Sequence, residues 1–378
     1  MFVRTYHALR FGIVALCVLA FAGLANAQTP PVWKATTSYQ AGNLVVGSDT
    51  NTYRSILAST GHNPVVDADG WWELSQTYVP TTLIVGVKQR FTKIEQAWGF
   101  LRHAVIPSSA PVTISLSTQN AAFEEVLTAP INLDHAFGAN ISIVGDDELT
   151  VHVECASGVS AFKLDSNDTF GGLKNMTITG EPAPGETTAI SLENGATLYG
   201  QDVTIGSFYN GVTLGDGSKL IFVPNGGVAV LDIYNCFNAA AQVETGSYLD
   251  VPGIAINTTG TSQYGIYLAD KSHASVTGGV HHTTVAAVFA TNGSSANIPS
   301  STIDTTVLGI RVLSHSDANA QLTHITSTGV GVEASYGSTV NIFGGGATGT
   351  TPYYLPNGVI TAGADVDNLG KDGSYIYH

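Results

Sequence analysis

Cysteine is almost absent from this sequence of 378 residues, which contains only three. Cys17 lies in an apolar N-terminal stretch, so Cys155 and Cys236 alone remain for the rest of the chain. Two cysteines in about 350 residues are too few to build a disulfide framework. The fold must therefore be held together by packing and hydrogen bonds.

Charged residues are also scarce, at 11% of the chain, and the basic ones are the rarer kind, with 14 Lys and Arg against 29 Asp and Glu. The formal net charge is −15, and it becomes −17 (12 − 29) when Arg4 and Arg10 are set aside with the N-terminal stretch. A negative surface repels phosphate groups, so nucleic acids and anionic membranes are excluded as partners. Neutral glycans, cations and other proteins remain.

Only one long hydrophobic run is present, FGIVALCVLAFAGLA at residues 11–25. It follows two arginines and leads into Ala25-Asn26-Ala27, the pattern of a secretory signal peptide and its cleavage site. The run is too short for a membrane span, and Leu16 before Cys17 argues against a lipid anchor. We therefore expect residues 1–27 to be removed and the mature protein to be secreted by a bacterial Sec-type pathway into the extracellular space, with the periplasm as the alternative.

Strong helix formers are few, whereas glycine (42 residues), threonine, serine, asparagine and valine are abundant, which favours short strands separated by turns. A repeat organises these strands. GIRVLSHSDA begins at Gly309, and a related stretch, GVEASYGSTV, begins 22 residues later. Stacking the chain on Gly309 gives small residues at intervals of 22–29, which we call the register positions: Ala161, Ala189, Gly211, Ala240, Gly265, Ala287, Gly309 and Gly331.

The residue after each register position and the residue two further on are apolar or small, as are Ile310 and Val312. This is the alternation of a strand that buries one face. A hydroxyl recurs seven residues after the register position, at Ser218, Ser247, Ser272, Ser294, Ser316 and Ser338. A period of about 22 residues with several short strands predicts a coil that pairs each strand with its counterpart one turn above, which is a parallel β-helix.

A helix is predicted just before the repeat, in FTKIEQAWGFL, where Thr92 and Glu95 form a capping box and apolar residues follow helical spacing. The apolar residues are Phe91, Ile94, Trp98 and Leu101. With this helix, residues 90–343 resemble the right-handed parallel β-helix proteins of the pectin-lyase-like superfamily. The resemblance implies an all-β, right-handed coil whose open bottom is plugged by the helix.

Enzymes of this superfamily cleave polysaccharides, either by lyase chemistry with calcium-bound carboxylates or by hydrolysis with clustered aspartates. Calcium is therefore the cofactor that the resemblance suggests. The strings typical of the hydrolases, among them a Gly-His-Gly and an Arg-Ile-Lys, are missing from this sequence. The resemblance thus predicts the fold more firmly than it predicts a reaction.

A separate unit at residues 32–75 precedes the helix. It resembles the small chitin- and cellulose-binding modules of carbohydrate-binding families 5 and 12, in which planar rings stack on pyranose units. The residues that carry the resemblance are Trp33, Tyr39, Gly42, Val45, Tyr53, Gly61, Pro64, Trp71 and Trp72.

One feature of this module departs from the family pattern, because Leu57 and Ala58 stand where a sugar-binding Trp pair is common. Adjacent residues of one strand point in opposite directions, so Trp71 or Trp72 is expected to be exposed and to bind glycan. The other aromatic residues, Trp33, Tyr39 and Tyr53, are predicted to form the core of the module.

Residues at equal offsets on neighbouring coils stand one strand spacing apart, so outward-facing columns can be predicted from the repeat. Two residues after the register position, one column contains Tyr267, Phe289, Arg311 and Glu333. Aromatic rings beside charged groups suit a groove that binds sugars, with Tyr267, Phe289 and Arg311 as the contacts. A cross-strand ladder ending in a surface ion pair is the alternative.

A second outward column, seventeen residues after the register position, contains Asn257, His282, Asp304 and Thr326. It places His282 beside Asp304, the pairing that a general base needs, and it points His281 inward. An ordinary polar ladder is the alternative. The candidate catalytic residues are thus His282, Asp304 and Glu333, and no metal site is predicted.

The chain is predicted to consist of a signal peptide (1–27), a carbohydrate-binding-like β module (31–78), a linker with the capping helix (79–110), the parallel β-helix (111–343) and a C-terminal cap or tail (344–378). Three functions remain open. The first is a secreted protein that binds a polysaccharide or a cell-surface glycan. The second is a glycoside hydrolase or polysaccharide lyase that acts on extracellular glycan. The third is a structural protein or adhesin similar to phage tail spikes and fibres, for which a homotrimer is expected.

Overall fold

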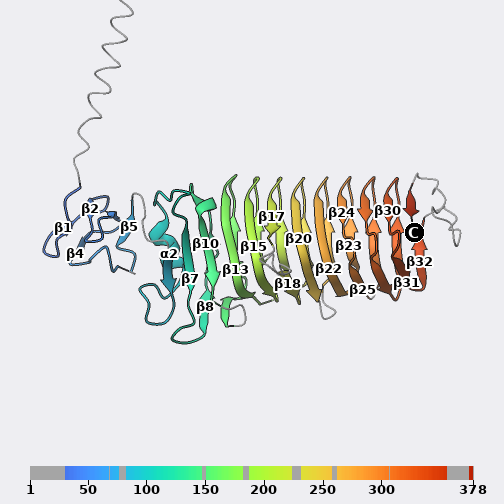
Figure 1. Cartoon of the computed structure of the whole chain (residues 1–378), viewed down its shortest axis with the longest axis horizontal. Coiled ribbons are helices and arrows are strands. Elements are labelled where there is room, and N and C mark those ends of the chain that lie inside the picture. The colour runs from blue at the N-terminus through green and yellow to red at the C-terminus, as the bar shows by residue number, and fades with distance from the viewer. Residues whose placement is uncertain are drawn as a thin grey trace, which may run out of the picture.

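The protein is a column of stacked coils in its computed structural model, which describes residues 30–67, 69–75, 82–146, 150–181, 187–223, 231–257, 262–305, 307–355 and 374–377. The column is a parallel β-helix of about nine turns with about 25 residues per turn, and the protein is 52% strand and 4% helix. Figure 1 shows the coils side by side, with a small separate unit at the N-terminal end. The predicted all-β coil is confirmed. The expected signal peptide lies outside the described residues.

One side of the column is a parallel sheet of ten strands that contains or adjoins every register position. Its strands are β9 (Ile131–Asn132), β12 (Phe162–Leu164), β14 (Thr188–Leu192), β16 (Asn210–Leu214), β19 (Ala239–Val243), β21 (Tyr264–Leu268), β23 (Ala286–Ala290), β26 (Leu308–Val312), β29 (Val330–Ala334) and β32 (Thr351–Tyr354). The register residues are small because the next coil lies against them. A Cβ added to Gly309 would come within 2.4 Å of the Gly331 carbonyl oxygen.

The rest of the column is formed by a sheet of 18 strands. They are β6 (Thr82–Val85), β7 (Val112–Leu116), β8 (Phe123–Leu127), β10 (Ile141–Gly145), β11 (Val151–Cys155), β13 (Thr169–Thr179), β15 (Thr197–Gly206), β17 (Lys219–Phe222), β18 (Leu231–Tyr234), β20 (Tyr248–Asn257), β22 (His273–Thr283), β24 (Ser295–Asn297), β25 (Thr302–Thr305), β27 (Asp317–Asn319), β28 (His324–Ser327), β30 (Thr339–Asn341), β31 (Gly346–Thr348) and β33 (Tyr375–Tyr377). The longest strands pair with two partners on one neighbouring coil, as β15 does with β17 and β18.

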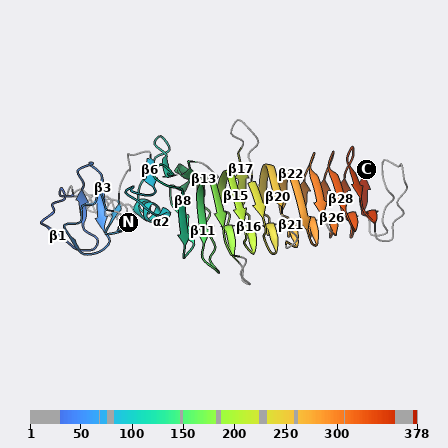
Figure 2. The same ribbon diagram turned by 90° about the horizontal axis from the view of Figure 1, so that it is seen from below.

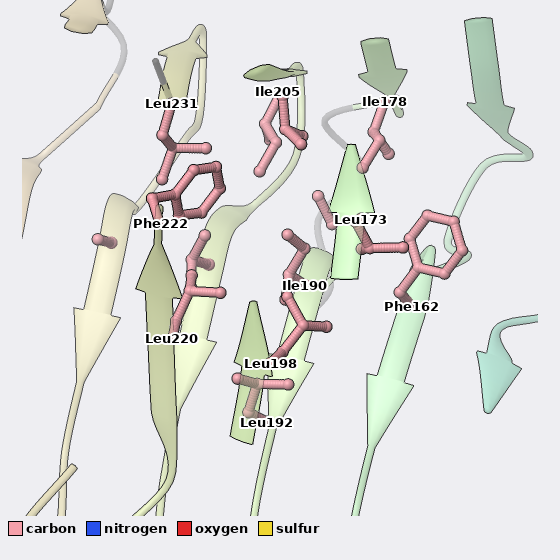
Figure 3. Close-up of a cluster of buried hydrophobic side chains, with 14 of the residues drawn as sticks. Phe162, Leu173, Ile178, Ile190, Leu192, Leu198, Ile205, Leu220, Phe222 and Leu231 are labelled. Atoms are coloured by element: carbon pink, nitrogen blue, oxygen red, sulfur yellow. The ribbon is translucent and has the colours of Figure 1, made fainter. Parts of the chain in front are cut away.

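Apolar side chains fill the inside of the column in rows that run from coil to coil (Figure 3). Phe162 is in register with Ile190, and Leu198 is in register with Leu220. All four are fully buried, and burying a side chain of this size is worth roughly 1.5–3 kcal/mol. These rows hold the coils together without disulfides, and the two cysteines of the described residues are buried free thiols.

The predicted hydroxyl positions form a ladder inside the column. The backbone N–H of Ser294 donates to Ser316 Oγ at 3.1 Å, and that of Ser316 donates to Ser338 Oγ at 3.2 Å. The ladder continues to Ser374, whose Oγ accepts from the N–H of Ser338 at 3.2 Å. Ser374, directly before β33, therefore supplies one more rung.

The column extends past residue 343, where the repeat in the sequence fades. Strand β31 pairs with β28, β32 pairs with β29, and β33 pairs with β30. Most of the remaining C-terminal segment, residues 356–373, lies outside the described residues. No helix among the residues that the structure describes is long and apolar enough to cross a membrane.

Helix α2 (Ile94–Leu101) forms where the apolar spacing predicted a helix and closes the N-terminal end of the column, as the resemblance implied; five of its eight residues are buried between the first coil and the front module. The predicted capping box is wrong by one residue. Gln96, not Glu95, accepts hydrogen bonds from the N–H groups of Thr92 and Lys93, at 2.9 and 3.2 Å. The reason is that Lys93 is the N-cap, so the third helical position falls on Gln96.

The front module contains two small antiparallel sheets, β1 (Ser38–Tyr39) with β4 (Ser59–Thr60), and β2 (Leu44–Val46) with β3 (Thr52–Ser55) and β5 (Trp72–Leu74). Tyr39, Tyr53 and Trp72 are buried in it, whereas Trp33 is half-buried. Figure 2 shows the module next to α2. Glu73 Oε2 lies 3.3 Å from His103 Nε2, just after α2, so a polar contact joins the module to the column.

Candidate functional site

The first predicted column forms on the outer face of the ten-stranded sheet. Tyr267, Phe289, Arg311 and Glu333 are in register on successive strands. The rings of Tyr267 and Phe289 are parallel within 6°, with centroids 5.4 Å apart. Since contacting carbon atoms lie roughly 3.5–4.0 Å apart, this separation requires a lateral offset of about 4 Å. Each ring therefore leaves part of its face uncovered.

The charged end of this column is an ion pair. Arg311 Nε lies 3.1 Å from Glu333 Oε2, and the Arg311 guanidinium lies 5.7 Å from the centroid of the Phe289 ring. Ser335 Oγ also donates a hydrogen bond to Glu333 Oε1 at 3.2 Å. Glu333 is only 8% exposed, so its carboxylate is engaged by neighbours of the same sheet.

Three further aromatic residues lie at or just before the starts of neighbouring strands of this sheet. The Tyr264 ring is 5.2 Å from that of Tyr267 and 5.5 Å from that of Phe289. On the two preceding coils, the rings of Tyr209 and Phe237 stack at 5.7 Å. These residues were missed because they lie one to three residues before their register positions, whereas the columns were predicted only at later offsets. The signal was an aromatic residue recurring just before Gly211, Ala240 and Gly265.

We call Tyr209, Phe237, Tyr264, Tyr267 and Phe289 the aromatic stripe. It lies on, or one or two residues before, β16, β19, β21 and β23, four consecutive strands of the ten-stranded sheet, and so extends over about 14 Å at one strand spacing per coil. Burial, with smaller contributions from Glu244, Tyr264 and Asp270, raises the pKa of Tyr267. Its hydroxyl therefore stays protonated at neutral pH and can donate a hydrogen bond to a ligand.

The second predicted column is wrong at its histidine. His281, not His282, opposes both Asn257 and Asp304, and the register shifts between His281 and Thr283. His282 has a left-handed backbone, with φ at 62°, because one extra residue bulges out of β22 at this point. The bulge also turns His281, predicted to point inward, to a half-exposed position in line with Asp304.

The three candidate catalytic residues do not share one face. Asp304 lies on β25 in the 18-stranded sheet, and His282 lies on β22 of the same sheet, outside its column. Glu333 lies on β29 in the ten-stranded sheet. Among the residues that the structure describes, no three His, Cys, Asp or Glu side chains are grouped so as to hold a metal ion.

Of the two adjacent Trp residues of the front module, Trp72 is buried and Trp71 is half-buried. Trp72 is 2% exposed and donates its indole N–H to the carbonyl oxygen of His62 at 2.9 Å. Trp71 is half-buried and stacks on the His62 ring, with centroids 4.1 Å apart. Leu57, at a place where a sugar-binding Trp was expected from the resemblance, is 52% exposed. The outer face of the module is therefore more aliphatic than aromatic.

A cavity of about 400 Å³ lies between the front module and α2. The rings of Trp72, Phe91 and Phe100 line it, together with carboxylates from both sides of the junction. Burial raises the pKa of Asp67, against the lowering effect of the hydrogen bond from the Trp72 N–H. The cavity joins segments outside the repeat, so no periodicity in the sequence could have predicted it.

A comparison with protein families, with characterised proteins and with solved structures found no match to this chain. The fold and the geometry described above are therefore the basis for the function proposed below.

Proposed function

We propose that the protein is exported and binds a polysaccharide along the aromatic stripe, on a β-helix related to the pectin-lyase-like superfamily. The observation that carries this proposal is the stripe itself, five rings on four consecutive coils, on or just before strands of one sheet. The N-terminal sequence of residues 1–27, with its cleavage pattern, supports export.

The stripe suits a sugar chain for geometric reasons. Offset rings such as Tyr267 and Phe289 present apolar faces on which the C–H face of a pyranose can stack. Tyr267 and Phe289 are in register on neighbouring coils, so an extended chain that lies along the column contacts both rings. The formal charge of −15 favours neutral glycans over acidic ones.

Binding without cleavage is the better-supported form of this function. Hydrolysis by paired carboxylates needs two of them on either side of the scissile bond. Asp304 and Glu333 lie in different sheets, and Glu333 is engaged by Arg311 and Ser335. The proposal therefore assigns Tyr267 and Phe289 to sugar binding and leaves Glu333 as the partner that positions Arg311.

The test compares retention of the mature protein on insoluble neutral polysaccharides with that of the double variant Tyr267→Ala/Phe289→Ala. We expect the double variant to bind at least tenfold more weakly, because each lost ring removes about 1 kcal/mol of stacking. Tyr248→Ala is the matched control, since Tyr248 stacks on His273 at 5.1 Å in the other sheet. Equal retention of the double variant and the wild type would refute the proposal. Release of reducing ends or unsaturated products, with calcium present, would identify an enzyme instead.

A further inference from the structure

We propose that the cavity between the front module and α2 is a second binding site, for one hexosamine unit with a free amino group at the end of a glycan chain. It is separate from the aromatic stripe, and it rests on the proposed function only for the choice of a sugar as the ligand. Its volume of about 400 Å³ falls within the usual range of small-molecule sites.

A glycine in the wall of this cavity points to a ligand. Gly99 lies within α2, where glycine costs roughly 0.5–1 kcal/mol relative to alanine. Close packing does not explain it, because a Cβ at this position would meet no atom within 4 Å. Its backbone lies within a regular helix, so no left-handed turn requires it either. Gly99 thus keeps volume open at a cost in helix stability.

The floor of the cavity is apolar and rigid. Phe91 and Phe100 contact one another with centroids 5.5 Å apart, and the guanidinium of Arg90 lies 4.8 and 4.5 Å from their two ring centroids. Trp72 completes the floor and is fixed by hydrogen bonds at its backbone and indole N–H groups. Such a floor suits the apolar face of a pyranose ring.

The rim of the cavity selects for positive charge. Asp67, Asp69 and Glu73 line it from the module and Glu95 lines it from α2, against Arg102 in the lining and Arg90 beside the floor. Glu73 is neutralised by Arg54 at 2.7 Å and contacts His103. Asp69 and Glu95 are exposed, one on each side of the opening. An ammonium group can therefore approach carboxylates from both sides, whereas a uronic acid is repelled.

The experiment titrates the mature protein at pH 6 with three trisaccharides, of glucosamine, of N-acetylglucosamine and of galacturonic acid, and follows calorimetry and tryptophan fluorescence. We expect the glucosamine trimer to bind at least tenfold more tightly than the N-acetylated trimer, and the acidic trimer not to bind. Gly99→Leu fills the cavity and should abolish binding while the melting temperature stays equal or rises, since leucine is the better helix former. Asp69→Asn/Glu95→Gln should weaken binding at least tenfold.

Three results would overturn this assignment: no binding of the glucosamine trimer to the wild type, unchanged binding by Gly99→Leu, or equal affinity for the charged and the N-acetylated trimers. The stripe variant Tyr267→Ala/Phe289→Ala should bind the trimer like the wild type. If that variant also retains polysaccharide fully while Gly99→Leu loses the trimer, the stripe proposal fails and the cavity site stands. If instead the stripe variant loses polysaccharide and Gly99→Leu still binds the trimer, the stripe proposal stands and the cavity site is refuted.

Discussion

Pairs of residues with a left-handed backbone form a corner after seven of the eight register positions. They stand five and six residues after the register position, as in Asn292-Gly293, with φ at 55° and 75°. Two positive φ values in succession are the mark of a type I′ turn, which favours Asn-Gly and Asp-Gly pairs. Most of these corners have glycine second, but Asp270-Lys271 and Ser314-His315 do not.

The corner at His315 predicts a stabilising substitution. His315 has φ at 60°, a conformation that costs a residue with a Cβ about 1–2 kcal/mol. We expect His315→Gly to raise the free energy of unfolding by about 1 kcal/mol, after allowing for the greater flexibility of glycine in the unfolded chain. Urea denaturation measures the change. His315→Ala is the control, because alanine keeps the Cβ; if it stabilises as much as glycine, backbone strain is not the cause.

At the scale of elements, the 22-residue step predicted the contacts of the ten-stranded sheet correctly. Tyr267, Phe289 and Arg311 are in register as expected, because their strands pair without a register shift. The prediction failed at His282, because a bulge adds one residue to β22 and places His281 instead of His282 opposite Asp304. A bulge leaves a weaker pattern in the sequence than a repeat does, so it was not predicted.

A second difference concerns β33, whose place in the column the 22-residue step did not predict. Gly373-Ser374-Tyr375-Ile376 has the same pattern of glycine, serine, any residue and an apolar residue as Gly337-Ser338-Thr339-Val340. The two stretches are 36 residues apart, so a comparison at 22-residue intervals does not find the match. Ser374 nevertheless takes the next place in the serine ladder. The cavity beside α2 could not be predicted at all, because it arises where two non-repeating elements meet.

The contact between β8 and α2 predicts a pH dependence of stability. The backbone N–H of Ile94, at the start of α2, donates to Glu125 Oε2 at 2.7 Å. Burial raises the pKa of Glu125 from 4.5 to about 7, against the lowering effects of that hydrogen bond and of Lys93. The folded protein thus holds this proton more tightly than the unfolded chain, so its contribution to stability is full below pH 4.5 and is lost as the pH rises through 7.

We expect this contribution to amount to about 3 kcal/mol between pH 4.5 and pH 8. Glu125→Gln stays neutral and keeps an oxygen for the Ile94 N–H, so it should remove this dependence and raise the melting temperature at pH 8. Thermal denaturation across this pH range measures both effects. Glu124→Gln, an exposed neighbour on the same strand, should leave the pH profile of the wild type intact. A Glu125→Gln profile that still falls with pH contradicts the assignment.

At the scale of the whole molecule, a stack of parallel coils has two ends, and each exposes strand edges that can pair with other chains. At the N-terminal end, α2 packs on the first coil and the front module packs on α2. At the C-terminal end, β33 adds the last described strand beside β30. The elements at the two ends therefore determine whether the column pairs with other copies of the protein. The repeat determines only the structure of the coils.

The role of β33 predicts the effect of one substitution. Ile376 is fully buried and in register with Val340, so Ile376→Asp would place an unpaired carboxylate among apolar side chains and detach β33. The N–H groups of Gly337 and Ser338 would then lose their acceptor, Ser374 Oγ. We expect faster hydrogen exchange at these two amides and concentration-dependent association, measured by exchange mass spectrometry and light scattering. Ile376→Val should behave like the wild type, and continued protection of Gly337 and Ser338 in the aspartate variant would show that β33 does not close this end.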